Sequence, residues 1–228
     1  MKTESTNRRY YELVSEVMQA MSHPVRILLL DMLCQCERSV DELANVSMEP
    51  VRNTSHHLQQ LKRASLVTSR RDGRRILYRP ADDAVVSIWS AFRSFAEARI
   101  PELKLGALEE RRIESDSMEP LKDWDDLIDK AKRGEISLVD VRPEEEFDFD
   151  HLPGAVSIPL ERLESHAKDL TPGVPMVVYC RGGACRLART AVDRLQKMGF
   201  FAVCIEKGVV DWKARGFDFI EQSSIQVG

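Results

Sequence analysis

Apolar and polar residues follow different periods in the two halves of the chain. Before residue 113 the apolar positions recur mostly at helical spacing, as in YYELVSEVMQAM and SHPVRILLLDMLCQC. After residue 120 the short apolar runs ISLVDV, PMVVYC and FFAVCIE alternate with amphipathic patterns such as CRLARTAVDRLQKMGF, which is typical of a parallel sheet covered by helices. The polar stretch IESDSMEP lies between them. We therefore predict two domains, 1–112 and 121–228, joined by a linker at 113–120.

The first half contains local signals for the starts and ends of its elements. Ser22 is the expected N-cap of the helix in SHPVRILLLDMLCQC. SVDELA matches a capping box, in which Ser39 accepts a bond from the third helical amide and Glu42 reaches back. LVTSRRDGRRILYR is predicted to form two strands joined by Asp72-Gly73, a pair suited to a two-residue type I′ turn.

Between the capping box and the hairpin lies a segment with one apolar and one polar face, MEPVRNTSHHLQQLKRASLV. Its predicted inward-facing residues are Val51, Thr54, Leu58, Leu61 and Leu66. Its outward-facing residues are rich in hydrogen-bonding groups: Arg52, Asn53, Ser55, His56 and Gln59.

The hairpin that follows this helix is strongly basic. Four arginines crowd its tip, namely Arg70, Arg71, Arg74 and Arg75. Helix, turn, polar-faced helix and basic hairpin in this order predict a mainly α-helical winged helix-turn-helix. In such a domain the second helix of the motif enters the major groove, where its polar side chains meet base edges, and the hairpin arginines contact phosphates.

Four segments of this half, MSHPVRILLLDML, SVDELA, NTSHHLQQLKRASLV and RRDGRRILYR, resemble the ArsR-type repressors over about the first hundred residues. The resemblance implies a double-stranded DNA operator and a homodimer, paired through the first helix and the helix after the hairpin. The second of these, AVVSIWSAFRSFAEARIPELKLGAL, has an apolar excess that suits burial against another chain, packing within one chain, or both: Val85, Ile88, Trp89, Phe92, Phe95 and Ile100.

Many ArsR-type repressors bind a metal through cysteines in the helix where this chain has SVDELA. The matching positions here are Ser39 and Asp41, so we expect no metal site and no cofactor. Cys34 and Cys36 lie just upstream, and two thiols at i and i+2 point to different faces unless the helix has ended. They are either buried structural residues or a thiol sensor.

In the second half, Cys180 follows the predicted strand PMVVYC and precedes a glycine-bearing loop that leads into a helix. Open α/β sheets place their ligand sites at this position. Loop amides and a helix N-terminus stabilise a thiolate, Gly182 and Gly183 allow the amides to turn inward, and Arg181 adds positive charge near a substrate anion. Cys180 is therefore predicted to be a nucleophile or to carry an anionic group.

Three segments of this half, LVDVRPEEEFDFDHLPGAVSIPL, VVYCRGGACRLA and GFFAVCIEKGVVDWKARGF, resemble a single rhodanese domain. The resemblance implies an α/β fold with a parallel sheet and helices on both faces. It also implies that Cys180 takes the outer sulfur of thiosulfate or a polysulfide as a persulfide and passes it to a nucleophilic acceptor. Asp140 and Arg142 would support the site, and the loop that binds the substrate would be Arg181, Gly182, Gly183, Ala184, Cys185 and Arg186.

Two features of the loop leave alternatives open. Cys180, five residues and Arg186 is the phosphate-cradle spacing of phosphatases and arsenate reductases of this fold, although Tyr179 stands where those proteins usually have histidine. Cys185 is either a small residue at a helix start or a thiol that resolves a Cys180 persulfide or sulfenate as a disulfide. We expect a structural hydrogen bond from His151 and a place in the strand core for Cys204.

The composition of the chain bears on its partners and on its cellular compartment. With 43% hydrophobic residues the chain can form packed cores, and its net charge of −4 gives no general preference for polyanions. Five cysteines, no membrane-length apolar run and no secretory signal at the N-terminus predict a soluble cytoplasmic protein with reduced thiols and no membrane partner. Three functions stay open: a repressor that responds to sulfane sulfur, a sulfurtransferase that dimerises through its winged helix, and an arsenic-responsive regulator with a reductase- or phosphatase-like tail.

Overall fold

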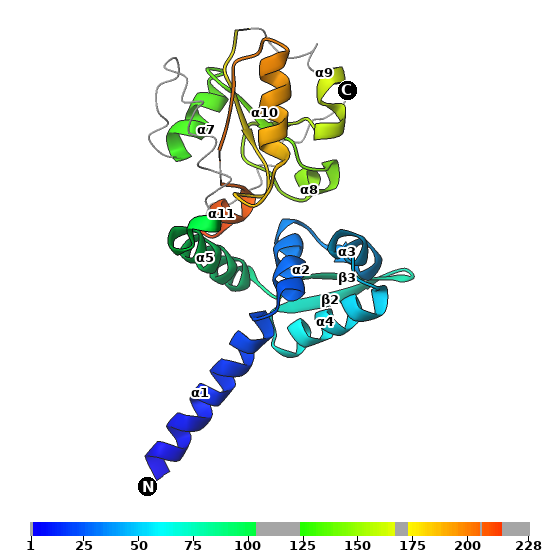
Figure 1. Cartoon of the computed structure of the whole chain (residues 1–228), viewed down its shortest axis with the longest axis vertical. Helices are drawn as coiled ribbons and strands as arrows, with labels where there is room; N and C mark the ends of the chain where they lie inside the picture. Colours follow the sequence, from blue (N-terminus) through cyan, green and yellow to red (C-terminus); the bar gives the residue numbers. More distant parts are fainter. Residues whose placement is uncertain (1, 104–123, 167–172, 206, 216–228) are drawn as a thin grey trace, which may run out of the picture. The chain divides into compact units, whose positions relative to one another are not determined.

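The computed structural model describes residues 2–103, 124–166, 173–205 and 207–215. The chain forms two compact units, Met1–Trp89 and Ser90–Gly228 (Figure 1). The boundary between the units falls within helix α5, Asp83–Arg99. The predicted linker at 113–120 lies outside the described residues.

The first unit is a winged helix. Its helix-turn-helix consists of α3 and α4, its wing is the β2–β3 hairpin, and β1 adds a third antiparallel strand in the order β1-β3-β2. This confirms the predicted order of elements. In chain order they are α1 Lys2–Met21, α2 Pro24–Gln35, β1 Arg38–Ser39, α3 Val40–Ser47, α4 Val51–Arg63, β2 Val67–Asp72 and β3 Arg75–Pro80.

Local capping fixes where two of these helices begin. The capping box of α3 is confirmed, since the Ser39 hydroxyl accepts a bond from the Glu42 amide at 3.3 Å and the Ser39 amide donates to the Glu42 carboxylate at 2.6 Å. The predicted cap of α2 is wrong by one residue. His23 is the N-cap and accepts from the Val25 amide at 3.2 Å, whereas the Ser22 hydroxyl donates back to a carbonyl of α1.

The apolar face of α4 forms part of the core of the first unit. Leu58 and Leu61 are fully buried, Thr54 and Leu66 are buried beside them, and each buried leucine contributes on the order of 1.5–3 kcal/mol. Val51 is 49% exposed, so its predicted inward position is wrong. It is the first residue of α4 and therefore lies beyond the part of the helix that packs on the core.

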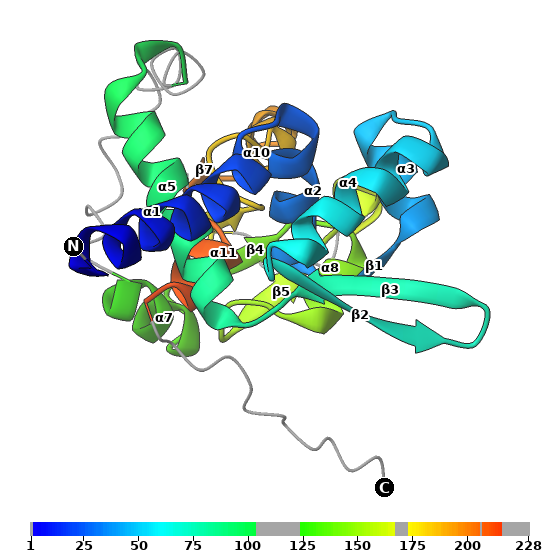
Figure 2. The same ribbon diagram turned by 90° about the horizontal axis from the view of Figure 1, so that it is seen from below.

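The wing projects beyond α4 as a two-stranded hairpin (Figure 2). Asp72 pairs with Arg75, so the two turn residues are Gly73 and Arg74 rather than Asp72 and Gly73. Gly73 has a positive φ of 58° and Arg74 does not. A type I′ turn needs positive φ at both positions, so the predicted type is wrong; a positive φ at the first position alone is the pattern of type II′.

The second unit has a four-stranded parallel sheet in the order β5-β4-β6-β7. Successive strand residues face opposite sides, because side chains alternate along a strand. Leu138 and Val177 pack with α7 and α11, whereas Val139 and Val178 pack with α10. This confirms the predicted parallel sheet with helices on both faces, although the short strand β5 was not predicted.

The elements of the second unit after α5 are α7 Trp124–Lys132, β4 Ser137–Asp140, α8 Glu144–Phe149, β5 Ala155–Ser157, the 3-10 turn η2 Leu160–Arg162, α9 Leu163–His166, β6 Met176–Tyr179, α10 Leu187–Lys197, β7 Ala202–Cys204 and α11 Val209–Lys213. In the described part of the chain, no helix has the length and apolar character needed to cross a membrane.

Candidate functional site

Cys180 lies directly after β6, a strand with neighbours on both sides, and is 2% exposed. The following loop bends back on itself, because the Cys185 amide donates to the Gly182 carbonyl at 2.9 Å. Gly182 has a φ of 132°, which side chains rarely adopt. This turn brings the backbone carbonyl of Cys185 to 3.4 Å from the Cys180 sulfur. The predicted strand, glycine loop and helix are thus confirmed around the thiol.

Backbone N–H groups around the loop lower the pKa of both thiols. Those of Ala188 and Gly182 act on Cys180, and those of Leu187 and Arg181 act on Cys185. An N–H dipole directed at a sulfur favours its thiolate form. Since Leu187 and Ala188 are the first two residues of α10, the helix N-terminus and the loop together favour one negative charge on the pair.

The side chains of the two thiols also interact with each other. This interaction lowers the pKa of Cys185 to about 6, against the effect of burial. The same interaction, together with burial, raises the pKa of Cys180. At neutral pH the resting charge therefore lies on Cys185, which differs from the sequence-based expectation of a populated Cys180 thiolate.

A cavity of about 10 Å³ adjoins both thiols. Such a volume holds about one water-sized atom or group. Cys204, at the end of β7, lines the cavity as well, so it is more than a residue of the strand core. The full lining is Cys180, Gly182, Gly183, Cys185, Ala188, Arg189, Cys204 and Ile205.

The arginine predicted to complete a phosphate cradle lies outside this cavity. Arg186 is exposed and precedes α10 as its N-cap, and Ala184 is exposed too. Arg189, one turn along α10, is the arginine that lines the cavity. The sequence reasoning missed it because the spacing rule selected Arg186. Arg189 could be found only from the position at which α10 begins, Leu187.

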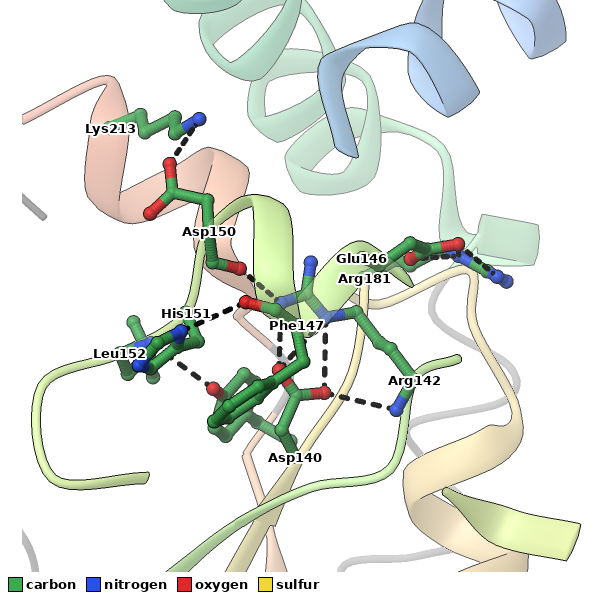
Figure 3. Close-up of polar contacts among 10 residues, drawn as sticks. Asp140, Arg142, Glu146, Phe147, Asp150, His151, Leu152, Arg181 and Lys213 are labelled. Atoms are coloured by element: carbon green, nitrogen blue, oxygen red, sulfur yellow. Dashed lines mark hydrogen bonds and ion pairs between the residues drawn. The ribbon is translucent and has the colours of Figure 1, made fainter. Parts of the chain in front are cut away.

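Arg181 is committed to an internal partner. Its guanidinium donates two bonds to the Glu146 carboxylate, at 2.6 and 2.9 Å, and Glu146 is completely buried (Figure 3). The predicted role of Arg181 as positive charge for a substrate anion is therefore corrected, because Glu146 compensates that charge. The pair instead anchors the loop to α8. No local sequence signal pointed to Glu146, which lies 35 positions earlier.

A second buried ion pair lies beside the site, at the end of β4. Arg142 donates to Asp140 at 2.7 Å and to the Asp150 carbonyl at 2.7 Å, and the side chains of Arg142 and Asp140 are completely buried (Figure 3). Tyr179, the residue before Cys180, accepts from the Leu152 amide through its hydroxyl at 3.1 Å. The network therefore ties the ends of β4 and β6 to the segment after α8.

His151 lies in this network but does not approach the thiols. Its Nδ1 is 2.9 Å from the Phe147 carbonyl, and the two rings stack with centroids 3.9 Å apart (Figure 3). The expected structural hydrogen bond of His151 is confirmed. Within the described residues, no three His, Cys, Asp or Glu side chains form a group that could hold a metal ion.

In the first unit, α4 presents a polar surface that continues onto the wing. Arg52, Asn53 and His56 are exposed, as predicted, and Ser55 is half-buried. In the wing, Arg71 and Arg74 are exposed. The other two wing arginines already have carboxylate partners: Arg70 with Glu37 at 2.6 Å, and Arg75 with Asp72 at 3.6 Å and Glu42 at 3.7 Å.

The two cysteines of the first unit are in a different environment. Cys34 and Cys36 are 2% and 4% exposed, in the unit's core. Helix α2 ends at Gln35, with Cys36 as its C-cap, so the two thiols are not both on a helical face. Their burial favours a packing role, and a sensing role requires the unit to open around them.

The helix predicted to pair two chains divides its apolar residues between two environments. Val85 and Trp89 are each 7% exposed and pack within the chain. Ile88, Phe92 and Phe95 are each more than half exposed. Helix α1 adds a second row of exposed apolar side chains, which are Tyr10, Tyr11, Leu13, Val14, Val17 and Met18.

Comparison with known proteins agrees with both halves of this description. The family model for the rhodanese-like domain matches residues 123–215. The HTH-type transcriptional regulator Rv0324 of Mycobacterium tuberculosis is 30% identical over 215 residues, which cover 94% of this chain and 93% of that protein. The HTH-type transcriptional repressor SmtB of the same organism is 37% identical over 81 residues, 36% of this chain and 60% of that protein.

Among solved structures, the chain is similar to the homodimeric winged helix-turn-helix DNA-binding domain of Mb0332 from Mycobacterium bovis, a possible ArsR-family transcriptional regulator. The TM-score is 0.40 and the sequence identity is 30%. The match covers 41% of this chain and 86% of that chain. The winged helix and the rhodanese-like sheet together define a two-domain regulator. The chain belongs to the family of ArsR-type HTH transcriptional regulators that carry a C-terminal rhodanese-like domain. It is a DNA-binding transcriptional regulator with a sulfurtransferase-like domain.

Proposed function

We propose that the protein is a dimeric repressor that links gene expression to sulfane sulfur through a persulfide on Cys180. The observation that carries this proposal is the cavity beside Cys180, whose volume of about 10 Å³ matches a single added sulfur atom. The backbone bonds from Gly182 and Ala188 would stabilise the terminal sulfur as an anion. A nucleophile, an anion cradle and room for one atom are what persulfide formation needs.

The size of this cavity argues against the two alternatives with a tetrahedral oxyanion substrate, phosphatase and arsenate reductase chemistry. Attack on phosphorus or arsenic requires the tetrahedral centre to enter the cavity with its oxygens, which exceeds the room for one water-sized group, whereas a sulfane donor needs to place only its outer sulfur there. Neither of the two loop arginines is placed to hold such a group, because Arg181 is paired with Glu146 and Arg186 lies outside the cavity. A phosphatase-like or arsenate-reducing tail is therefore disfavoured.

The sulfur-loading step breaks one bond in the donor and forms one at Cys180. With thiosulfate, the Cys180 proton passes to the Cys185 thiolate, and the Cys180 sulfur attacks the outer sulfur of the donor. The sulfur–sulfur bond of thiosulfate breaks, and sulfite leaves with the electron pair. The product is a Cys180 persulfide, and no external oxidant is needed.

In the DNA-binding half we propose that the exposed face of α4 reads bases and that the wing contacts phosphates. Asn53 and His56 are exposed on α4, and Arg71 and Arg74 are exposed on the wing. The exposed apolar rows of α1 and α5 support pairing with a second copy of the chain, since rows of this kind commonly mark a protein–protein contact.

The test is operator binding with and without a polysulfide, in the intact chain and in Cys180→Ala. We expect polysulfide to weaken binding by ~10-fold in the intact chain, about 1.4 kcal/mol of coupling, and to leave Cys180→Ala unaffected at low donor concentration. Quenched directly after mixing, the intact chain should show one added sulfur on Cys180 by mass, which cyanide removes as thiocyanate. An equal response in both chains would reject the role of Cys180.

If sulfur passes from Cys180 to the DNA-binding half, the candidate receiver in the first unit is the pair Cys34 and Cys36. Fusion in one chain gives a donor thiol a high local concentration near an acceptor, so no free carrier is needed. Cys34→Ser with Cys36→Ser should abolish the response if these thiols receive the sulfur. A normal response in this double variant would exclude them.

A further inference from the structure

Cys185 lies where a second thiol could attack a persulfide formed on Cys180. We infer that the Cys180–Cys185 pair discharges sulfane sulfur as hydrosulfide, with Cys185 attacking the Cys180 persulfide to form a disulfide within the loop. The inference rests on the proposed function, because the persulfide is its starting point. It adds a second activity to sulfur transfer: reduction of the bound sulfur by the protein's own two thiols.

The geometry of the loop supplies the approach. The turn closed by the bond from the Cys185 amide to the Gly182 carbonyl folds the chain back toward the strand end. As a result, the backbone oxygen of Cys185 is 3.4 Å from the Cys180 sulfur, and the two thiols line the same cavity. A nucleophile held this close reacts in an effectively intramolecular step.

The cavity determines which acceptor can reach the persulfide. Both thiols line it, and its volume of about 10 Å³ is taken up once the outer sulfur is in place. An external acceptor can approach the outer sulfur by the route that the donor used, but the inner sulfur, that of Cys180, is 2% exposed. Cys185 is already in the lining and half-buried, so it has access that an external thiol lacks.

The step balances without a further reagent. The Cys185 sulfur attacks the inner sulfur of the Cys180 persulfide and forms the new sulfur–sulfur bond. The bond between the inner and outer sulfurs breaks, and the outer sulfur leaves with the electron pair as hydrosulfide, taking the Cys185 proton. Two thiols are oxidised by two electrons in total, and the sulfane sulfur is reduced to sulfide.

The acidity of Cys185 suits both steps. Its lowered pKa, about 6, means that at neutral pH it is a thiolate that can receive the Cys180 proton as the donor is attacked. Its later attack needs the thiolate again, and the amides of Leu187 and Arg181 favour that form. A thiol with a pKa close to the ambient pH is also an efficient attacking group in thiol–disulfide exchange.

The test compares the full-length wild type with Cys185→Ser and a matched control, Cys204→Ser, which removes another thiol from the same cavity. Each is mixed anaerobically with less than one equivalent of polysulfide, quenched in acid and examined by intact mass, peptide mapping and a sulfide assay. Wild type and Cys204→Ser should release sulfide and lose the mass of two hydrogens, with the crosslink mapped to Cys180 and Cys185.

Cys185→Ser should keep the mass of one added sulfur on Cys180 and release sulfide at least about tenfold more slowly, because the intramolecular acceptor is gone. A wild type that keeps the added sulfur would overturn the inference and leave the proposed function standing. A folded wild type that neither gains sulfur on Cys180 nor releases sulfide would reject the proposed function. A crosslink to any other cysteine would also overturn the inference.

A second measurement does not depend on the fold of Cys185→Ser or on a sulfur donor. In the wild type, iodoacetamide should label Cys185 before Cys180, and the rate should fall as the pH drops through about 6, where Cys185 becomes protonated. In Cys180→Ala the midpoint for Cys185 should move upward, since the side chain that lowers its pKa is removed. First labelling at Cys180 would contradict the assigned roles.

Discussion

The arginines of the wing and those of the rhodanese-like domain differ in exposure and in what they hold. Arg70 and Arg75 are 55% and 58% exposed, and their partners Glu37 and Glu42 are 16% and 46% exposed. Arg142 is completely buried against a completely buried Asp140, and Arg181 closes over the buried Glu146. Water screens the first kind of pair, so a phosphate can compete for the arginine; the second kind is committed to the fold.

This difference shows why residue type alone does not identify a binding site. Both regions are rich in arginine and adjoin a predicted anion-binding element. In the wing the charge is available to an external anion, whereas beside Cys180 it is used to fix the loop. The anion at Cys180 is instead stabilised by backbone amides, which suit one sulfur atom better than a large oxyanion.

The largest effect is expected from breaking the buried pair. Arg142→Ala leaves the buried Asp140 carboxylate without its ion-pair partner, and removal of one partner from such a pair costs ~3–5 kcal/mol. Hydrogen–deuterium exchange of the β4 and β6 amides measures the decrease in protection in this unit. The control is Arg162→Ala, whose side chain is 59% exposed and paired on the surface, and it should exchange like the wild type. Equal protection in Arg142→Ala would show that the pair does not stabilise the site.

The next effect concerns base recognition by the exposed face of α4. Asn53→Ala and His56→Ala should each reduce the discrimination between operator and random duplex by about 1–3 kcal/mol for a good base contact. Titrations of both duplexes at one salt concentration measure this difference. An equal decrease in affinity for the two duplexes would place these side chains against phosphates instead.

Local signals in the sequence explain what could be predicted. The capping box at Ser39, the hairpin between two apolar runs, and the thiol between a strand and a glycine loop each depend on a few adjacent residues. The alternation of short apolar runs and helices predicts the parallel sheet for the same reason, since each run must be buried on both faces.

The remaining features depend on contacts and element ends that the local residue pattern does not specify. The partner of Arg181 is Glu146, and no local pattern connects them. Arg189 rather than Arg186 lines the cavity because α10 begins at Leu187. A change of one residue in the helix cap would shift that start. The one-residue shift of the wing turn has the same origin, because pairing of Asp72 with Arg75 overrides the preference of Asp-Gly for the turn itself.

A smaller effect is expected from the exposed wing arginines. Arg71→Ala or Arg74→Ala should weaken binding to all duplexes alike. Each should also reduce the slope of log affinity against log salt by about one unit for every phosphate that the side chain neutralises in the wild type. Fluorescence anisotropy across a salt series gives the slope. Arg162→Ala again serves as the control, since it removes the same charge from the other unit. An unchanged slope in both wing variants would reject the wing as a phosphate-binding element.

The smallest effect separates the two kinds of wing arginine. Arg70 donates two bonds to the Glu37 carboxylate, at 2.6 and 2.9 Å, so a phosphate must displace Glu37 to bind it. Arg70→Ala should therefore change the salt slope less than Arg74→Ala does. Glu37→Gln should strengthen binding to all duplexes, because it removes a competing charge from Arg70 and from Arg79, which lies 3.7 Å away.

A double-mutant cycle makes this last comparison quantitative. If Glu37 acts by holding Arg70, the increase in affinity from Glu37→Gln should shrink in an Arg70→Ala background, and the part that remains belongs to Arg79. The same anisotropy series measures all four proteins. An increase of equal size in both backgrounds would mean that Arg70 does not compete between Glu37 and phosphate. In that case Arg70, despite its exposure, would be committed to its internal partner as Arg142 is.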